Sequence, residues 1–400
     1  MAAYAPARYI DLHALQPLPA SLLNRGEDND PKTLLLGGVV RAMVSSQSWK
    51  RPIRLRVEED LDEPAARTRM LPLRVADALA AAGWPKDLAA FAGAQIVRSA
   101  NVEGLKTEED QGGITSALLF LPRNVLADLT DMCEEHRPQL EEALAQETAD
   151  AAARTEKGGQ KKKSKPTAVL PTRAVAAVIR RRTATINLFG RMLAEVPGAH
   201  VDGAVQMAHA FTVHQSDQQP DYFTAVEDWG NLGEHGSAHL QTAFFTTGVI
   251  YRYTTVNLTE LTRNLDGDAE QALHLLSLFA EAFIDVMPQA KKTSTAPHTM
   301  PHLVHYAVRD RRPVSYAAAF EQPVRHAHGG GHTLPAVQAL SQYAGALNRL
   351  LGTRRRIAHG YATFQDTPID HLGTAHASFD DLVDALTRAA AQPSPPRAVA

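Results

Sequence analysis

The sequence predicts a mixed α+β fold, because strand periodicity and helix periodicity occupy different parts of the chain. The segment RYIDLHAL, residues 8–15, alternates apolar residues such as Ile10 and Leu12 with Asp11 and His13, the pattern of a strand with one buried face. After residue 200 the predicted order is strand, strand, helix, strand. An antiparallel sheet backed by helices in this order is the ferredoxin-like, or RRM-like, plan.

A polar loop and a long helical stretch follow the first strand. Residues 21–38, SLLNRGEDNDPKTLLLGG, are rich in turn-forming residues and predict a loop before a helix. From about 57 to 184, helical spacing dominates, and we expect this region to be a helical insertion. Near its end, around residues 154–168, the sequence EKGGQKKKSKP is poor in apolar residues and predicts a mobile, solvated, Lys-rich loop.

Strand signals return after residue 200. The segments VDGAVQMAHAFTVH (201–214), FFTTGVIYRYTTVNL (244–258) and HLVHYAVR (302–309) are rich in β-branched and aromatic residues. Between the last two, residues 270–287 carry an apolar helical stripe. We expect a C-terminal helical segment over 331–388 and a disordered, Pro-rich tail over 389–400.

Composition indicates a globular protein. The chain has 400 residues, 44% of them apolar and 21% charged, enough for one large core or two ordinary ones. Its single cysteine, Cys133, excludes an intrachain disulfide and predicts a structural thiol in a reducing compartment. No segment resembles a signal peptide or a membrane span, so we expect a cytoplasmic protein without a membrane partner.

A formal net charge of -3 argues against a protein that coats nucleic acid over its whole surface, but it allows a local basic groove. The stretch RAMVSSQSWKRPIR, residues 41–54, is the main candidate. Its cations and neutral donors could bond phosphate and ribose: Arg41, Lys50, Arg51 and Arg54, with Ser45 and Gln47 among the neutral groups. The alternative is an ordinary helix start, capped by Ser45 or Ser46, with its cations in water.

Longer stretches carry a family resemblance. They are residues 21–54, FGRMLAEV (189–196), VDGAVQMAHAFTVHQSD (201–217), residues 221–258, and the helix ending MPQAKK (287–292). In order and spacing they resemble the CasC-type backbone subunit of Cascade, the type I-E CRISPR surveillance complex. The resemblance covers the first 56 residues and about 186–330.

The resemblance implies a hand-like molecule. An RRM-like palm would comprise 1–56 and 185–330, helical fingers 57–184, and a thumb 217–248 within the palm. Members of this family stack head to tail along the CRISPR RNA, so the implied partners are that RNA, further copies of the chain, other Cascade subunits, and target DNA through the bound guide.

The resemblance also implies a set of RNA-binding residues. It places phosphate contacts at Arg25, Lys50 and Arg51, with Ser45 and Gln47 beside them. It makes Gly190, Arg191 and Met192 the place where the chain approaches the guide, with Met192 wedged between bases. Where relatives often carry a basic run before SSQS, this chain has GGVVRAMV, in which only Arg41 is charged.

Two rival functions stay open. The first is a metal-dependent ribonuclease, in which Asp28 and Asp30 would bind Mg²⁺; the same residues also suit an ordinary solvated turn. The second is a general single-stranded RNA-binding protein. His326, His328 and His332 could approach a transition metal or belong to a glycine-rich turn. We expect a scaffold and not an enzyme, with no catalytic residue, metal or cofactor.

Overall fold

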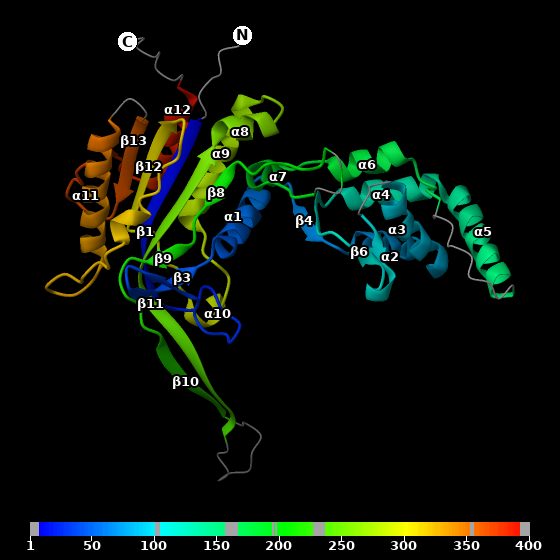
Figure 1. The fold of residues 1–400 in the computed structure, drawn as a ribbon, viewed down its shortest axis with the longest axis horizontal. Coiled ribbons are helices and arrows are strands. Elements are labelled where there is room, and N and C mark those ends of the chain that lie inside the picture. Colours follow the sequence, from blue (N-terminus) through cyan, green and yellow to red (C-terminus); the bar gives the residue numbers. More distant parts are fainter. Residues whose placement is uncertain are drawn as a thin grey trace. The chain divides into compact units, whose positions relative to one another are not determined.

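The structure is a computed structural model that describes residues 8–100, 105–156, 167–193, 196, 198–226, 237–352 and 356–392. The chain divides into two compact units (Figure 1). Unit 1 comprises Met1–Asp60 and Ala204–Ala400, and unit 2 comprises Leu61–Gly203. Most of the predicted Lys-rich loop and residues 393–400 of the predicted tail lie outside the described residues.

Unit 1 is built on one ten-stranded sheet. Its main path runs β14-β13-β12-β1-β11-β9-β3-β2, and β8 and β10 also pair with β11. The strands are β1 (Arg8–Ser21), β2 (Thr33–Leu36), β3 (Val39–Val44), β8 (Val205–Met207), β9 (Ala210–Thr212), β10 (Gln219–Val226), β11 (Ser237–Asn257), β12 (Leu303–Asp310), β13 (Arg356–Thr363) and β14 (Thr374–Ala375).

The long strand β1 lies at the centre of this sheet. It pairs antiparallel with β11, from Tyr9 opposite Asn257 to Leu18 opposite Gly248, and with β12 on its other side. β11 continues beyond its pairing with β1 and pairs there with β10 in a hairpin. This hairpin falls within the segment predicted as a thumb, whose residues 227–236 lie outside the described part of the chain.

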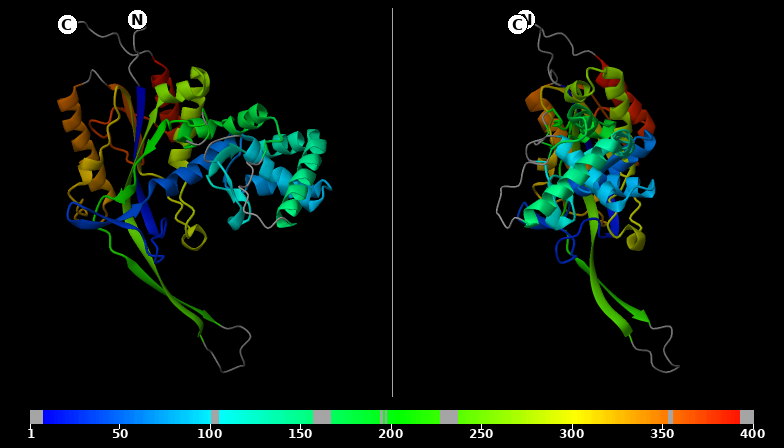
Figure 2. Two further views of the ribbon diagram at one scale, coloured as in Figure 1. Left: turned by 45° about the vertical axis from the view of Figure 1, so that its right-hand side comes forward. Right: turned by 90° about the vertical axis from the view of Figure 1, so that its right-hand side faces the viewer.

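Helices cover both faces of the sheet in unit 1 (Figure 2). α1, α9 and α12 pack together on one face, while α11 packs on the other against Leu15 and Tyr251. The helical segments are α1 (Ser46–Asp60), α8 (Leu258–Asn264), α9 (Ala269–Asp285), α10 (Lys292–Thr295), the 3-10 turn η2 (Ala317–Phe320), α11 (Thr333–Leu351) and α12 (Phe379–Ala391).

This double cover corrects the prediction that only one face of the first strand is buried. Ile10 and Leu12 are buried as predicted, but Asp11 and His13 are also fully buried. The reason is that Tyr316, in the segment between β12 and α11, stacks on the His13 ring with the ring centroids 4.0 Å apart.

The C-terminal region also differs from the prediction of a purely helical segment. β13 lies between the two helices and extends the sheet beside β12, with Leu303 opposite Thr363. The final helix α12 continues to Ala391, three residues into the predicted tail, because Ala389 and Ala390 are buried.

Unit 2 is mainly helical, as the insertion predicts, but it extends to residue 203 and contains two small sheets. Its elements are β4 (Ala65–Thr68), α2 (Leu71–Ala81), α3 (Lys86–Ala100), β5 (Thr107–Glu108), η1 (Glu109–Gln111), β6 (Ile114–Thr115), β7 (Leu119–Pro122), α4 (Val125–Glu135), α5 (Arg137–Glu156), α6 (Thr172–Arg180) and α7 (Ala184–Phe189).

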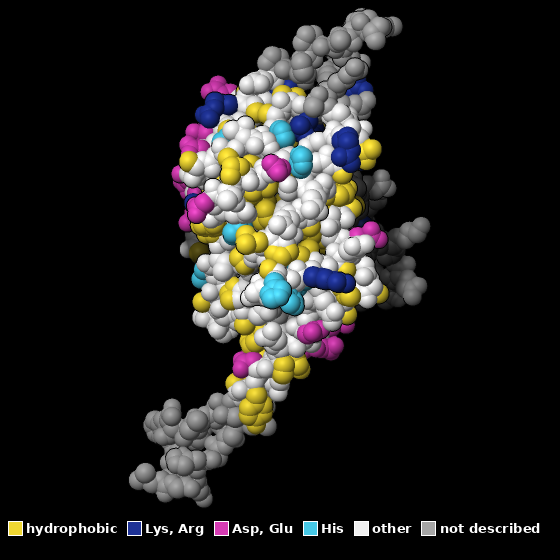
Figure 3. All heavy atoms as spheres, turned by 90° about the vertical axis from the view of Figure 1, so that its left-hand side faces the viewer, with side chains coloured by type: hydrophobic (Ala, Val, Ile, Leu, Met, Phe, Trp, Pro, Cys, Tyr) yellow, Lys and Arg dark blue, Asp and Glu magenta, His cyan; other side chains and the backbone are white. Residues whose placement is uncertain are grey.

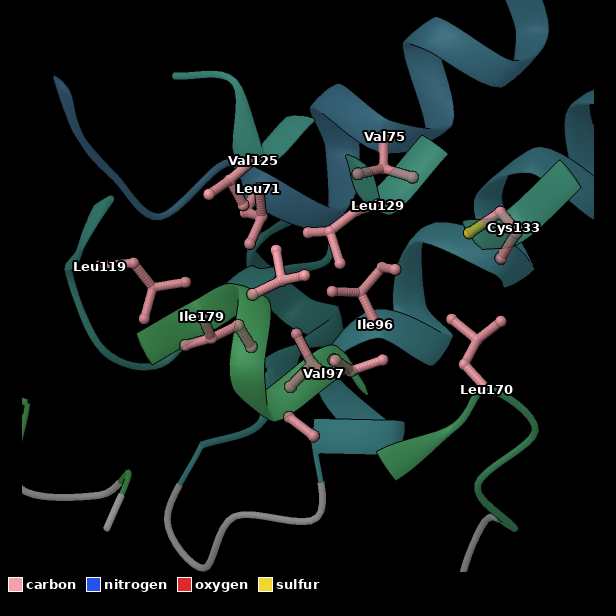
Figure 4. Close-up of a cluster of buried hydrophobic side chains, with 14 of the residues drawn as sticks. Leu71, Val75, Ile96, Val97, Leu119, Val125, Leu129, Cys133, Leu170 and Ile179 are labelled. Carbon is pink, nitrogen blue, oxygen red and sulfur yellow. The ribbon is translucent and has the colours of Figure 1, made fainter. Parts of the chain in front are cut away.

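The core of unit 2 joins its helices through aliphatic side chains (Figure 4). Ile96 from α3, Leu129 from α4 and Ile179 from α6 meet there. Cys133 is fully buried in the same core, and burial together with the charge of Glu134 raises the pKa of its thiol to about 12. Such a thiol packs as a small apolar group. None of the helices in the described ranges is long and apolar enough to cross a membrane.

Candidate nucleic-acid interface

The start of α1 is held in place by two side chains from distant parts of unit 1. Asn24 accepts a hydrogen bond from the backbone N–H of Ser45 at 2.8 Å, and Nδ1 of His209 accepts one from the N–H of Ser46 at 2.9 Å. The sequence reasoning missed both residues. Their roles depend on tertiary contacts, 21 and 163 residues apart in the chain, so no local pattern identifies them.

The exposed side of α1 carries the predicted polar groups. Gln47 and Arg51 are exposed and four residues apart, so they lie on one face of the helix, with the half-buried Lys50 beside them. The first turn contains no acidic residue. The opposite face buries Trp49 and Ile53 in the core. A helix N-terminus with cations and without carboxylates favours an anion.

The loop that carries Arg25 is fixed next to this helix start. The N–H of Gly26 donates to the carbonyl of Asp30 at 2.8 Å, and the N–H of Lys32 donates to the carbonyl of Asn24 at 3.0 Å. Arg25 itself is exposed, and its guanidinium donates to the side chain of Asn29 at 3.2 Å. Because Asn24 also binds the backbone of Ser45, Arg25 belongs to the same region of unit 1 as Gln47 and Arg51.

Two cations predicted to bind phosphate lie inside unit 1 instead. Arg41 is fully buried, and its guanidinium donates to the carbonyls of Thr212 and Phe320, each at 3.0 Å. Burial lowers the pKa of Arg41. Arg41 is buried because the segment around η2 packs over this part of the sheet. Buried carbonyl groups of that segment need hydrogen-bond donors, and the Arg41 guanidinium supplies them. Arg54 is 8% exposed and forms an ion pair with Glu58 at 2.6 Å.

Ser45 is also turned inward. It is 8% exposed, and its hydroxyl lies 3.2 Å from the hydroxyl of Ser48. Of the residues predicted in unit 1, the structure therefore brings Arg25, Gln47 and Arg51 to the surface, with Lys50 partly exposed.

The predicted triplet Gly190, Arg191 and Met192 lies in unit 2, directly after α7. Gly190 ends the helix with φ +79° and ψ 165°, and a Cβ built there would lie 2.7 Å from the backbone nitrogen of Gly203. Only glycine fits this conformation and this close approach. Arg191 and Val201 then exchange two backbone hydrogen bonds, of 2.9 and 3.0 Å.

Within this triplet, Arg191 points inward and Met192 outward. Arg191 is 3% exposed, whereas Met192 is 86% exposed. The Arg191 guanidinium donates to five backbone carbonyls, those of Phe120, Ile179, Arg180, Arg181 and Ala199. Burial and, secondly, the charge of Arg182 lower its pKa to about 10. Arg191 therefore holds the backbone of unit 2 together from the inside. This role differs from the RNA contact that the resemblance implies.

The face of unit 1 covered by α11 differs from the start of α1 (Figure 3). Hydrophobic side chains gather on it, and Lys and Arg side chains are few and scattered. α11 itself carries one charged residue, Arg349. Within the part of the chain that the structure describes, this face therefore offers no continuous cationic stripe.

The other predicted ligands are distributed as follows. Asp28 is exposed and Asp30 partly exposed in the Arg25 loop. The rings of His326 and His332 lie 6.1 Å apart, and His332 stacks on His214 at 3.7 Å. Among the described residues, no three His, Cys, Asp or Glu side chains lie close enough together to hold a metal ion.

Comparison with known proteins places this architecture in a family. Among curated proteins none matches the chain. A solved structure described as a CRISPR RNA-guided surveillance complex, pre-nicking, contains a chain 39% identical to this one, with a TM-score of 0.83; the match covers 96% of this chain and 100% of that chain. A second, described as a CRISPR RNA-guided surveillance complex, has a chain 35% identical with a TM-score of 0.74, covering 95% of this chain and 99% of that one. The family model described as CT1975-like protein matches residues 10–385, so this chain belongs to the CT1975-like family.

Proposed function

We propose that the chain is the repeated backbone subunit of a type I-E CRISPR surveillance complex, where it holds CRISPR RNA by its phosphates in antiviral defence. The observation that carries this proposal is the carboxylate-free start of α1, with Gln47 and Arg51 exposed on one face and Arg25 in the adjoining loop. The similarity at 39% identity to a chain of an RNA-guided complex supports it. The type I-E assignment depends on the motifs SSQSWKR and GSAHLQT in the sequence.

The architecture supports the remaining parts of the proposal. The order β12-β1-β11-β9, with α1 after β1 and α9 after β11, suits an RRM-like palm. Unit 2 would form the fingers and the β10–β11 hairpin the thumb. Copies of the chain would stack head to tail in the cytoplasm, together with other subunits, and the bound guide would pair with target DNA.

Backbone recognition suits this task for a physical reason. A protein that holds any guide must bind phosphate and ribose and leave the base edges free, because base pairing reads the target sequence. Gln47 and Arg51 donate hydrogen bonds to such groups without selecting a base. We therefore propose a scaffold without catalytic activity of its own.

The test is equilibrium binding of the full chain to labelled single-stranded RNAs of equal length and different sequence. We expect affinities within a few-fold of one another, and a log–log dependence on salt with a slope of about -0.7 for each phosphate neutralised. A strong preference for one sequence, or an affinity insensitive to salt, would contradict the proposal.

A further inference from the structure

A pocket on unit 1 lies where three helices meet, on elements that the proposed RNA site does not use. It has a volume of about 240 Å³ and is formed by the C-terminal ends of α1 and α9 and the N-terminal end of α12. Ala282, Ile284 and Val383 form its buried apolar wall. A space of this size and lining accepts an aliphatic side chain.

Two further apolar side chains line the pocket where it opens to solvent. Met300, which lines it, is 38% exposed, and Phe379 is partly exposed. Phe364, 65% exposed, lies against Phe379 in an edge-to-face contact with the ring centroids 6.4 Å apart. Two large apolar side chains of the lining, with the exposed Phe364 beside one of them, are typical of a surface that another molecule covers.

Carboxylates dominate the rim. Asp60, Glu281, Asp285 and Asp380 line the pocket together with a single cation, Arg56. Arg56 is already occupied, because its guanidinium pairs with Asp60 at 2.9 Å and with Asp285 at 3.2 Å. Neither Glu281 nor Asp380 forms an ion pair within the described ranges of the chain.

We propose that this acid-rimmed pocket docks a partner protein through a segment in which an aliphatic side chain is flanked by Lys or Arg. The aliphatic group would fill the apolar wall, and the cations would meet Glu281 and Asp380. Four carboxylates against one guanidinium repel phosphate, so the chemistry selects a basic polypeptide over RNA. The inference does not depend on RNA binding by α1.

The test uses the purified full chain without RNA and a fluorescein-labelled peptide, Gly-Lys-Arg-Leu-Arg-Lys-Gly, in fluorescence anisotropy. We expect saturable binding that weakens with salt, and at least fivefold weaker binding when serine replaces the leucine in the peptide. Glu281→Gln with Asp380→Asn should weaken binding of the leucine peptide about fivefold, since exposed ion pairs contribute modestly. Met300→Gln should weaken binding of the leucine peptide and leave binding of the serine peptide unchanged, so that the ratio of the two affinities falls.

The matched control is Glu134→Gln with Glu135→Gln, which removes two exposed carboxylates from α4 in unit 2 and should leave binding unchanged. Equal affinity for the leucine and serine peptides would overturn the proposal. So would a loss of affinity in the control variant as large as that in Glu281→Gln with Asp380→Asn, because either result would show only a general attraction of cations. Binding of labelled oligouridine that Met300→Gln weakens would overturn the proposal by placing RNA in the pocket. If the protein associates with itself without peptide, and Met300→Gln abolishes this association, a second copy of the chain occupies the pocket and the proposal is overturned. Because no RNA is needed, failure here leaves the proposed function standing, and the reverse also holds.

Discussion

Nε of Arg191 donates a hydrogen bond to the carbonyl oxygen of Ala199 at 2.8 Å, and this contact closes the loop from which Met192 projects. The other guanidinium nitrogens donate to four carbonyls in two further parts of unit 2, that of Phe120 and those of residues 179–181. In this motif, whose resemblance implies an approach to RNA, the buried Arg191 side chain holds the backbone, and the apolar side chain of the next residue, Met192, is exposed. We call the first of these the clamp role of Arg191.

Arg191→Ala should destabilise unit 2 strongly, because it leaves several buried carbonyls without a donor. Each such group costs about 1–3 kcal/mol, so we expect a loss on the order of 3 kcal/mol. Met192→Ala should change the free energy of unfolding by less than about 0.5 kcal/mol, since the side chain is exposed. Chemical denaturation monitored by circular dichroism measures both. If Arg191→Ala is as stable as the parent protein, the clamp role is wrong.

Gly190→Ala tests the same loop through its backbone. The new Cβ would lie 2.7 Å from the nitrogen of Gly203 and 2.8 Å from the carbonyl oxygen of Val201, at a positive φ. We expect a loss of about 2–4 kcal/mol in the free energy of unfolding. Gly83→Ala is the matched control. Gly83 has φ +89°, and a Cβ there would meet no atom within 4 Å, so the change should cost only about 1 kcal/mol. Equal losses would mean that the close approach at Gly190 is unimportant.

Arg51→Ala should weaken RNA binding without unfolding the protein. Arg51 is exposed, so stability should change by less than about 0.5 kcal/mol. If it contacts one phosphate, the log–log salt slope should become shallower by about 0.7. The control is Arg56→Ala on the same helix, because Arg56 pairs with Asp60 and Asp285 on the acid-rimmed pocket. RNA affinity reduced equally by both changes would indicate loss of general charge, not of a defined contact.

Periodicity identified the regular elements that bury a continuous apolar stripe. The predicted strands in 8–15, 244–258 and 302–309 correspond to β1, β11 and β12 to within one residue at their ends or lie inside them, and the predicted helix over 270–287 corresponds to α9. Each has many β-branched, aromatic or apolar residues at the correct spacing, so local and tertiary preferences agree. β13 escaped prediction because Gly360 and few β-branched residues leave its local preference weak, and its pairing with β12 decides its conformation.

The candidate site was harder to predict, because sequence spacing does not say which cations a fold buries. Arg41 and Arg51 look alike in the chain, yet Arg41 bonds carbonyls inside unit 1 and Arg51 lies at the surface. That difference is set by the segment around η2, some 280 residues after Arg41. Asn24 and His209, which bind the backbone at the start of α1, likewise depend on tertiary contacts that sequence spacing does not reveal.

Acidification should destabilise unit 1 through its buried histidines. Burial lowers the pKa of His305 to about 3 and the pKa of His13 well below its usual value. Since both stay neutral in the fold but gain protons in the unfolded chain below about pH 6.5, stability falls as the pH drops from there toward the folded pKa values. Burial raises the pKa of Asp11, against the effect of Arg309, so proton uptake by Asp11 offsets part of the loss.

We expect a loss on the order of 2–5 kcal/mol between pH 7.5 and pH 4.5, at about 1.4 kcal/mol per pH unit for each histidine at full effect. Urea unfolding at a series of pH values measures it. His305→Gln should make the dependence shallower, and His298→Gln, at an exposed position, should not change it. A urea midpoint that does not change with pH would show that His13 and His305 do not control the loss of stability in acid.

The last prediction concerns chemistry in the Arg25 loop, where a metal-dependent ribonuclease would need Asp28 and Asp30. Carboxylates that bring Mg²⁺ to a scissile phosphate stabilise the charge of its transition state, so their loss should lower a cleavage rate by orders of magnitude. If the chain is a scaffold, Asp28→Ala with Asp30→Ala should leave RNA retention unchanged. The assay incubates the RNA-loaded protein with labelled RNA complementary to the guide, with Mg²⁺ or Mn²⁺ and then with a chelator. We expect no cuts, because neither aspartate is buried and no third His, Cys, Asp or Glu ligand among the described residues joins them. Regularly spaced, metal-dependent cuts that disappear in the double variant would replace the scaffold by the ribonuclease.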